Sequence, residues 1–187
     1  MFLIIGLGNP GRKYAKTRHN LGKETVYFFA KVFHFPAFKT KKKNLAEISI
    51  GRIDKHRVIL AIPLVFMNES GKAVKMLITR YKLMTKNLWV IHDDLDIPLG
   101  KIKISFARSS GGHKGVDSII KELLTKKFFR LRIGIGAPLK GKFEKFVLEE
   151  FKKEEKVKIK KAKQMAIKAL ELAIKEFPEK AMSQYNQ

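Results

Sequence analysis

Short apolar runs alternate with segments whose apolar residues recur every three or four positions, and this alternation constrains the fold more than any other feature of the sequence. A short apolar run bounded by glycine or proline predicts a buried strand, whereas the longer spacing predicts an amphipathic helix. The predicted elements are, in chain order, a strand over 2–5, a helix over 21–33, a hairpin of strands over 48–53 and 58–62, a helix around 74–81, strands over 88–91 and 101–106, a helix around 116–124, a strand over 131–135 and a long helix over 154–176. Strands and helices in alternation predict an α/β sheet covered by helices.

The length and composition of the chain favour one folded domain. The chain has 187 residues, of which 45% are hydrophobic. A domain usually takes about 100 to 200 residues, and this share of apolar residues is typical of globular proteins. We therefore expect a single domain over residues 1–187, with a basic helix at about 154–176 and with function in a preformed site.

The chain is strongly basic, with 40 Lys and Arg against 17 Asp and Glu and a formal net charge of +23. This balance is typical of proteins that bind nucleic acid. The alternative is a lysine-rich surface that serves only solubility, because net charge informs about association and not about fold. The same two interpretations apply to the first half of the C-terminal helix, which carries Lys156, Lys158, Lys160, Lys161 and Lys163.

The chain contains no cysteine, which excludes disulfides, thiolate metal sites and cysteine nucleophiles and suits the cytosol. Its apolar start, MFLIIGLG, lacks a basic flank and breaks at Asn9-Pro10-Gly11. The run is therefore too short for a signal peptide or a membrane span. We expect a cytoplasmic protein with no membrane contact.

The glycine-rich stretch GLGNPG, residues 6–11, directly follows the first predicted strand and formally satisfies the GxGxxG dinucleotide fingerprint. Such a site also needs an acidic residue about twenty positions further on, where this chain has Lys31, Val32, Phe33 and His34. Nucleotide binding is therefore not favoured. Asn9 is more informative, because its amide in a rigid turn offers a ligand both a donor and an acceptor, although an ordinary Asx turn is the alternative.

Five histidines are candidates for a catalytic base, and their context ranks them. His34 lies between phenylalanines and His56 lies in the predicted hairpin turn, so a structural role is favoured for both; His19, His92 and His113 remain. His19 stands in a loop between the first strand and helix, where catalytic groups are common. Imidazole takes a proton from water near neutral pH when a partner, usually a carboxylate, fixes its tautomer.

Asp93 is the leading candidate for that carboxylate, because it follows a buried strand and ligands of open α/β sheets collect beyond the strand ends. The cluster of His92, Asp93, Asp94 and Asp96 also admits another interpretation, a Mg²⁺ or Mn²⁺ site of a nuclease or phosphatase that acts on RNA. No second acidic cluster supports it. The residues thus indicate a basic α/β protein with a His, Asp and Asn site that acts on RNA.

Six ordered blocks make the sequence more specific: GLGNPG, TRHN, FMN with SGKAV, HDDLD, GGH and RLRIGIG. In this order and spacing they resemble the signature blocks of bacterial peptidyl-tRNA hydrolases, over Met1 to about Phe151. The resemblance implies a monomeric α/β domain with a twisted mixed sheet surrounded by helices, without metal or organic cofactor. It also implies hydrolysis of the ester that joins a peptide to the 3′ end of tRNA. The alternatives are a catalytically weak relative that retains tRNA binding and the metal-dependent nuclease.

The resemblance also implies roles for single residues of the cavity. His19 would be the general base that activates water, and Asp93 would orient and support it. Asn9 and Asn68 match positions that hydrogen-bond the peptide and the terminal nucleotide. Tyr14 and Met67 match residues that shape the same pocket.

The tRNA contacts implied by the resemblance include two departures from the family pattern. Lys103 and Arg132 match a basic clamp on the 5′ phosphate of the acceptor stem, but Ser105 stands where the family commonly has a second basic residue. After His113 the chain has Lys114 in place of the usual asparagine. We expect this ammonium to meet a phosphate of the single-stranded 3′ end, the alternative being that it simply points to solvent.

Overall fold

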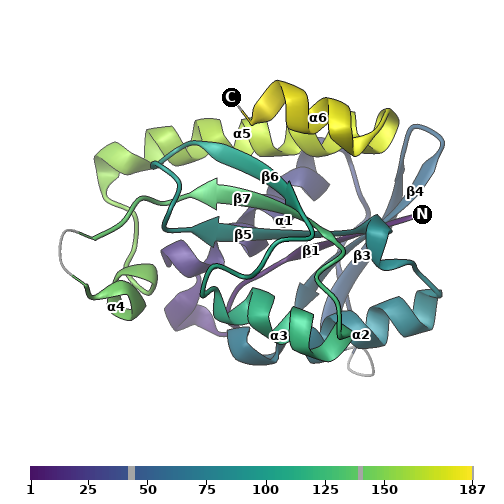
Figure 1. Ribbon diagram of the computed structural model, residues 1–187, viewed down its shortest axis with the longest axis horizontal. Helices are drawn as coiled ribbons and strands as arrows, with labels where there is room; N and C mark the ends of the chain where they lie inside the picture. Colours follow the sequence, from purple (N-terminus) through teal and green to yellow (C-terminus); the bar gives the residue numbers. More distant parts are fainter. Residues whose placement is uncertain (42–44, 139–140, 187) are drawn as a thin grey trace.

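A seven-stranded mixed sheet forms the centre of the fold within residues 1–41, 45–138 and 141–186, which the computed structural model describes (Figure 1). The strands are β1 Phe2–Gly6, β2 Lys39–Lys41, β3 Ala46–Ile53, β4 His56–Pro63, β5 Leu88–Asp94, β6 Ile102–Phe106 and β7 Phe129–Gly134. The α-helices are α1 Leu21–Val32, α2 Ser70–Tyr81, α3 Lys114–Leu123, α4 Phe143–Val147, α5 Lys153–Lys175 and α6 Pro178–Tyr185. Short 3-10 turns are η1 Arg12–Tyr14, η2 Arg18–Asn20, η4 Met67–Glu69 and η5 Thr85–Asn87.

The strand order is β2-β3-β4-β1-β5-β7-β6, and its four central strands run parallel. The hairpin of β2 and β3 on one side and β6 on the other are antiparallel additions. Parallel strands all end at the same edge, so the segments that follow β4, β1, β5 and β7 gather there. This edge is the left-hand side of Figure 1.

Helices cover both faces of the sheet, as the alternation of elements predicts. One face packs against α1 and α5, and the other packs against α2 and α3 (Figure 1). The long helix α5 has a buried stripe of small residues, Ala162, Ala166, Ala169 and Ala173. Such small side chains let the helix lie close to the sheet. None of the described helices is long and apolar enough to cross a membrane.

The exposed edge of β6 is covered by a side chain instead of a strand. Asn186 follows α6, and its Oδ1 accepts a hydrogen bond from the backbone N of Ile104 at 2.6 Å. Its Nδ2 donates to the backbone O of the same residue at 2.9 Å. The amide of Asn186 thus occupies the backbone donor and acceptor that a further strand would use.

The structure differs from the sequence predictions mainly where local pattern is weak. The strand β2 and the helices α4 and α6 are not predicted, and His56 begins β4 instead of lying in the turn. The helix α3 begins at Lys114, two positions before the predicted start, because the His113 ring caps it. On β6, Lys103 is exposed, whereas Ser105, two positions further on, is buried.

Candidate active site

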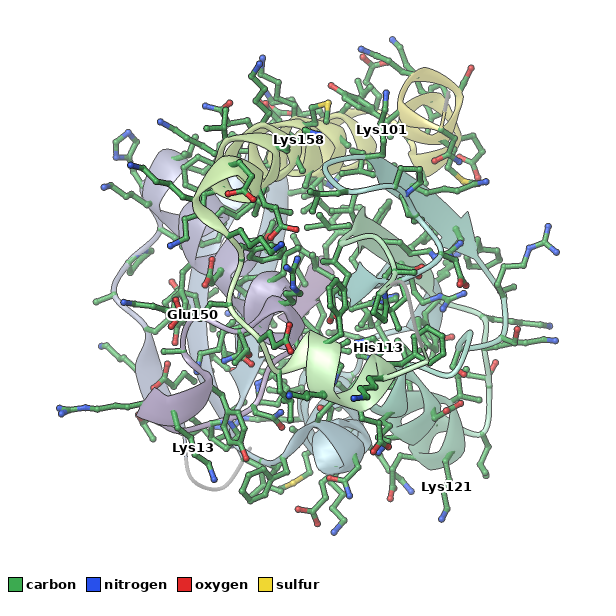
Figure 2. The ribbon with its side chains drawn as sticks, turned by 90° about the vertical axis from the view of Figure 1, so that its left-hand side faces the viewer. Lys13, Lys101, His113, Lys121, Glu150 and Lys158 are labelled. Atoms are coloured by element: carbon green, nitrogen blue, oxygen red, sulfur yellow. The ribbon has the colours of Figure 1, made fainter. Side chains whose placement is uncertain are left out.

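A cavity of about 650 Å³ opens at the edge where the parallel strands end. Figure 2 looks onto this edge, with His113 near the centre of the view and with Lys101 and Lys158 above it. Eight of the ten site residues expected from the sequence line the cavity: Asn9, Tyr14, His19, Met67, Asn68, Asp93, His113 and Lys114. Lys103 and Arg132 lie outside its lining, on β6 and β7.

The centre of the cavity is a buried pair of His19 and Asp93. The Nδ1 of His19, in η2, lies 3.0 Å from both carboxylate oxygens of Asp93, at the end of β5. Only 9% of His19 and 2% of Asp93 is exposed. An ionised carboxylate only accepts hydrogen bonds, so Nδ1 carries the ring proton and Nε2 keeps a free lone pair. The pair therefore has the tautomer that a general base needs.

His113 is the second donor to Asp93. Its Nε2 lies 3.2 Å from Oδ1 of Asp93, while its Nδ1 accepts from the backbone N of Gly115 and Val116 at the start of α3. Since backbone N–H groups only donate, the proton of the His113 ring lies on Nε2. Burial by itself would raise the pKa of Asp93, but the attraction of His19 and the hydrogen bonds from both rings outweigh it and hold that pKa well below its ordinary value.

His92 is a supporting residue whose position the sequence does not reveal. It is fully buried, its Nδ1 donates to the backbone O of Asp93 at 2.6 Å, and its ring meets the His113 ring edge to face at 4.5 Å between centroids. Burial, and next the neighbouring His113, lower its pKa well below the ordinary value. The His92 ring is therefore uncharged, packs against His113 and does not line the cavity.

The proposed divalent-metal cluster of residues 92–96 does not converge. Asp94 instead binds Arg132 Nε through Oδ2 at 2.7 Å, and through Oδ1 it accepts from the backbone N of Asp96 at 3.0 Å. Among the described residues, the group with metal-ligand spacing is His19, Asp93 and His113, whose ligand atoms lie within 4.8 Å of one another. A histidine ligand normally donates from its second nitrogen, whereas Nδ1 of His113 accepts two hydrogen bonds. This group therefore fits a hydrogen-bonded base better than a metal centre.

Asn9 is held in place from three sides. Its Oδ1 accepts from the backbone N of Met67 at 2.9 Å. Its own backbone N and O pair with Oδ1 and Nδ2 of Asn20, at 2.8 and 3.1 Å. The expected acceptor of Asn9 is thus already used, and Nδ2 remains as the donor for a ligand. Asn20 stands at the N-cap position of α1, but its side chain orients Asn9 and does not cap the helix.

The mouth of the cavity is apolar and aromatic. Tyr14 meets Phe66 edge to face at 6.5 Å, and Phe66 is 51% exposed. Across the cavity, α4 contributes Phe143, and Leu148 follows that helix; both are about half exposed. Asn68 is the exposed amide among these side chains. The mouth therefore offers apolar contact together with a few hydrogen-bonding groups, as ligand cavities usually do.

Lys114 neither points freely to solvent nor presents an unpaired cation. Its Nζ lies 2.7 Å from Oε1 of Glu144 on α4, and both side chains are exposed at the cavity mouth. The hydrogen bond from Lys114 and its charge lower the pKa of the Glu144 carboxyl. A phosphate that binds Lys114 would have to compete with this carboxylate.

The residues expected to clamp a phosphate lie side by side on two antiparallel strands. Lys103 of β6 pairs with Arg132 of β7, and Ser105 pairs with Arg130 in the same ladder. Arg130 is only 3% exposed, and burial, together with Arg132, lowers its pKa to about 10. The position of the Ser105 departure thus has a guanidinium across the strand pair. A role for Arg130 is not apparent from the sequence, because both arginines of RLRIGIG look alike there.

The mixed α/β sheet, the basic composition and the buried His–Asp pair in an open cavity together define a class, hydrolytic enzymes that activate water. Within it, the sequence model of the family described as "Peptidyl-tRNA hydrolase" matches residues 3–187. The chain belongs to the peptidyl-tRNA hydrolase family, hydrolases that act on the ester bond of peptidyl-tRNA.

Named relatives and a solved structure agree with this assignment. The peptidyl-tRNA hydrolase of Thermodesulfovibrio yellowstonii is 44% identical over 188 residues, covering 100% of this chain and 99% of the relative. That of Aquifex aeolicus is 43% identical over 185 residues, covering 98% and 95%. The crystal structure of peptidyl-tRNA hydrolase from Acinetobacter baumannii superposes with a TM-score of 0.94 at 33% identity, covering 100% of this chain and 94% of that one.

Proposed function

We propose that His19 is the general base of ester hydrolysis in this enzyme. Nε2 of His19 takes a proton from a water molecule as that water attacks the ester carbonyl, and the same proton is then given to the departing 3′ oxygen of the tRNA. Asp93 keeps the ring oriented and stabilises the imidazolium that forms between the two steps. The observation that supports this most directly is the 3.0 Å contact between Nδ1 of His19 and the Asp93 carboxylate.

The specificity for an acylated amino group follows from the hydrogen-bonding groups at the cavity. In this scheme, the free Nδ2 of Asn9 and the amide of Asn68 bind the peptide main chain and the terminal nucleotide. An aminoacyl-tRNA with a free ammonium would bring a charge into this half-apolar cavity, and desolvating that charge is costly. Tyr14 and Met67 shape the same space.

The tRNA contacts extend from the cavity along two strands. Lys103 and Arg132 bind the 5′ phosphate of the acceptor stem, and His113 and Lys114 lie next to the 3′ end, where Lys114 exchanges Glu144 for a phosphate. The first half of α5 adds a wider contact, since Lys156, Lys158 and Lys160 are exposed and form no ion pair among the described residues. Lys158 also packs near Gly100, on the same side of the molecule as the cavity (Figure 2).

The reaction needs no cofactor in this scheme, because water and an imidazole base suffice for an ester. The enzyme acts as a monomer, as the family resemblance implies, and in the cytoplasm, which the lack of cysteine and the peptidyl-tRNA substrate support.

One assay tests the whole proposal. Purified protein is incubated with N-acetyl-aminoacyl-tRNA in EDTA, and both ester loss and RNA length are followed; free aminoacyl-tRNA serves as the control substrate. We expect ester loss from the acetylated substrate only, with full-length tRNA as product. Shortened RNA, or activity abolished by the chelator, would show a metallonuclease, and binding without ester loss would show a binding protein.

A further inference from the structure

The residue before the proposed base, Arg18, is a fully buried cation that the mechanism does not use. It is 2% exposed, and its guanidinium carbon lies 4.2 Å from the ring centroid of Phe146 and 4.7 Å from that of Phe151. Its Nη2 lies 2.7 Å from Oε2 of Glu155 on α5. Nε and Nη1 have no hydrogen-bond partner among the described residues. The guanidinium is thus held mainly by two aromatic faces and one carboxylate.

Both rings belong to residues 143–151, which we call the cavity wall. Phe143, Glu144, Val147 and Leu148 of the wall line the cavity. The helix within it, α4, has no fully buried residue, and the wall meets the hydrophobic core only through the partly buried Phe146, Val147 and Phe151. It is attached through its inner side, where Phe146 and Phe151 enclose Arg18.

The backbone around Arg18 makes the same connection. The backbone N of Arg18 donates to the backbone O of Glu149 at 3.0 Å, and Thr17 forms an isolated bridge with Glu150. Arg18 and His19 share the three-residue turn η2, in which the backbone N of Asn20 closes on the backbone O of Thr17. A turn this short has no residue that absorbs a shift, so a displacement of Arg18 reaches His19 directly.

Charge alone does not explain the choice of this residue. A buried ion pair is often no more stabilising than apolar residues of similar volume, whereas a planar guanidinium combines stacking on two rings with a directed hydrogen bond. Lysine has no planar face to place between Phe146 and Phe151. The arrangement therefore fixes a distance and an orientation between η2 and the cavity wall.

We infer that Arg18 is a positioning residue that holds the cavity wall in register with His19, so that a peptide seated on the wall presents its ester at the base. This inference rests on the proposed function for its catalytic consequence. A misplacement of about 1 Å in such an arrangement is enough for a loss of about a hundredfold in rate. Arg18 acts through His19 and the wall and does not touch the substrate.

The experiment uses two Arg18 variants, the single variant Arg18→Lys and the double variant Arg18→Met with Glu155→Gln. The control variant is Ile167→Ala. Ile167 lies in the buried face of α5, about three turns beyond Glu155, so its truncation lowers stability without loosening the wall. Four quantities are measured: kcat, KM, hydrogen exchange of residues 143–151, and the NMR signal of the proton on Nδ1 of His19. The proton signal reports the geometry of the His19–Asp93 pair, which a purely stabilising role would leave unchanged.

For both Arg18 variants we expect kcat to fall by about ten- to a hundredfold, exchange in residues 143–151 to increase and the His19 proton signal to shift or broaden. The double variant leaves no unpaired buried charge and therefore folds even if Arg18→Lys does not. Ile167→Ala should lower the Tm and leave the other readouts as in the parent.

Arg18 variants that lower only the Tm, like the control, would overturn the inference. If the parent protein hydrolyses no ester, the proposed function fails, while the exchange and NMR readouts still decide whether Arg18 couples the wall to His19.

Discussion

The floor and the wall of the cavity are built in opposite ways. On the floor, His19, Asp93 and Asn9 are buried, the side chain of His113 is 8% exposed, and hydrogen bonds assign a proton or a lone pair to each ring. The wall, residues 143–151, exposes apolar side chains and carries an ion pair between exposed partners. In the proposed mechanism, the proton-transfer groups are therefore preorganised, whereas the peptide binds to an exposed apolar surface.

The largest expected effect is on the floor. His19→Ala removes the only proposed acceptor of the water proton and should lower kcat by about two to four orders of magnitude, the usual contribution of a general base. Binding of tRNA should change little, because the contacts to phosphates remain. Single-turnover hydrolysis and a separate binding titration measure the two effects. A variant within tenfold of the parent rate would remove His19 from the role of base.

Asp93→Asn should do less harm, with a loss of about ten- to a hundredfold in kcat. The asparagine keeps the shape, but in either orientation its NH₂ group faces the N–H of His19, because Nδ1 of His19 lies 3.0 Å from both carboxylate oxygens. Steady-state kinetics measures the loss, and a variant as slow as His19→Ala would mean that Asp93 does more than orient and support the base.

The same variant has a stability signature in pH. The pKa of Asp93 is lowered on folding, so the ionised carboxylate adds stability that is complete above its ordinary pKa of 3.8 and is lost as pH falls through the lower folded value. The difference in unfolding free energy between parent and Asp93→Asn should therefore shrink as pH falls below about 5. Urea unfolding across this range checks the sign, and a difference that grew on acidification would contradict it.

Outside the cavity, Lys103→Ala and Arg132→Ala should act mainly on KM, since phosphate contacts position the substrate without taking part in the chemistry. Arg132→Ala also releases Asp94 from its 2.7 Å ion pair, so it should have the larger effect of the two. Steady-state kinetics with several tRNAs should show a similar loss for each. A strong drop in kcat at saturating substrate with KM unchanged would place these residues in the floor instead.

The lysines of α5 should contribute less per residue. Changing Lys156, Lys158 and Lys160 to Gln should flatten the plot of log affinity against log salt by about 0.9 for each duplex phosphate that is no longer bound, with kcat unchanged. The control changes Lys31, Lys55 and Lys86, which are exposed near the opposite ends of the parallel strands, and removes the same charge. An equal effect of both triple variants would mean that only net charge matters and that α5 is a solvated face.

The smallest effect belongs to the ion pair on the wall. Because both partners are exposed, Lys114→Asn should change kcat and affinity by no more than about threefold. Glu144→Gln instead releases the ammonium, and it should tighten tRNA binding and steepen its salt dependence. Filter binding at several salt concentrations compares the two variants. Identical salt slopes in both would exclude Lys114 from phosphate contact.

The same contrast explains what could be predicted from the sequence. The central strands contain continuous apolar runs, so the sequence predicts that these strands are buried. Asp93 comes just after the apolar run of β5, so the sequence also predicts its position at the end of that strand. The wall has no such pattern, and α4 is too short to show helical spacing. Arg18 looks like any basic surface residue, because the carboxylate that binds it lies 137 positions away. The sequence also does not reveal the tautomer of His113, because that tautomer is set by the backbone N–H groups at the start of α3.

Asn186, whose amide takes up both backbone groups of Ile104, has a consequence for the protein in concentrated solution. An open strand edge is a template on which a second molecule can add its own strand, and such additions repeat into aggregates. Here a visiting strand would meet an edge already saturated at its middle residue. Asn186 therefore blocks the addition of a strand from a second molecule at Ile104.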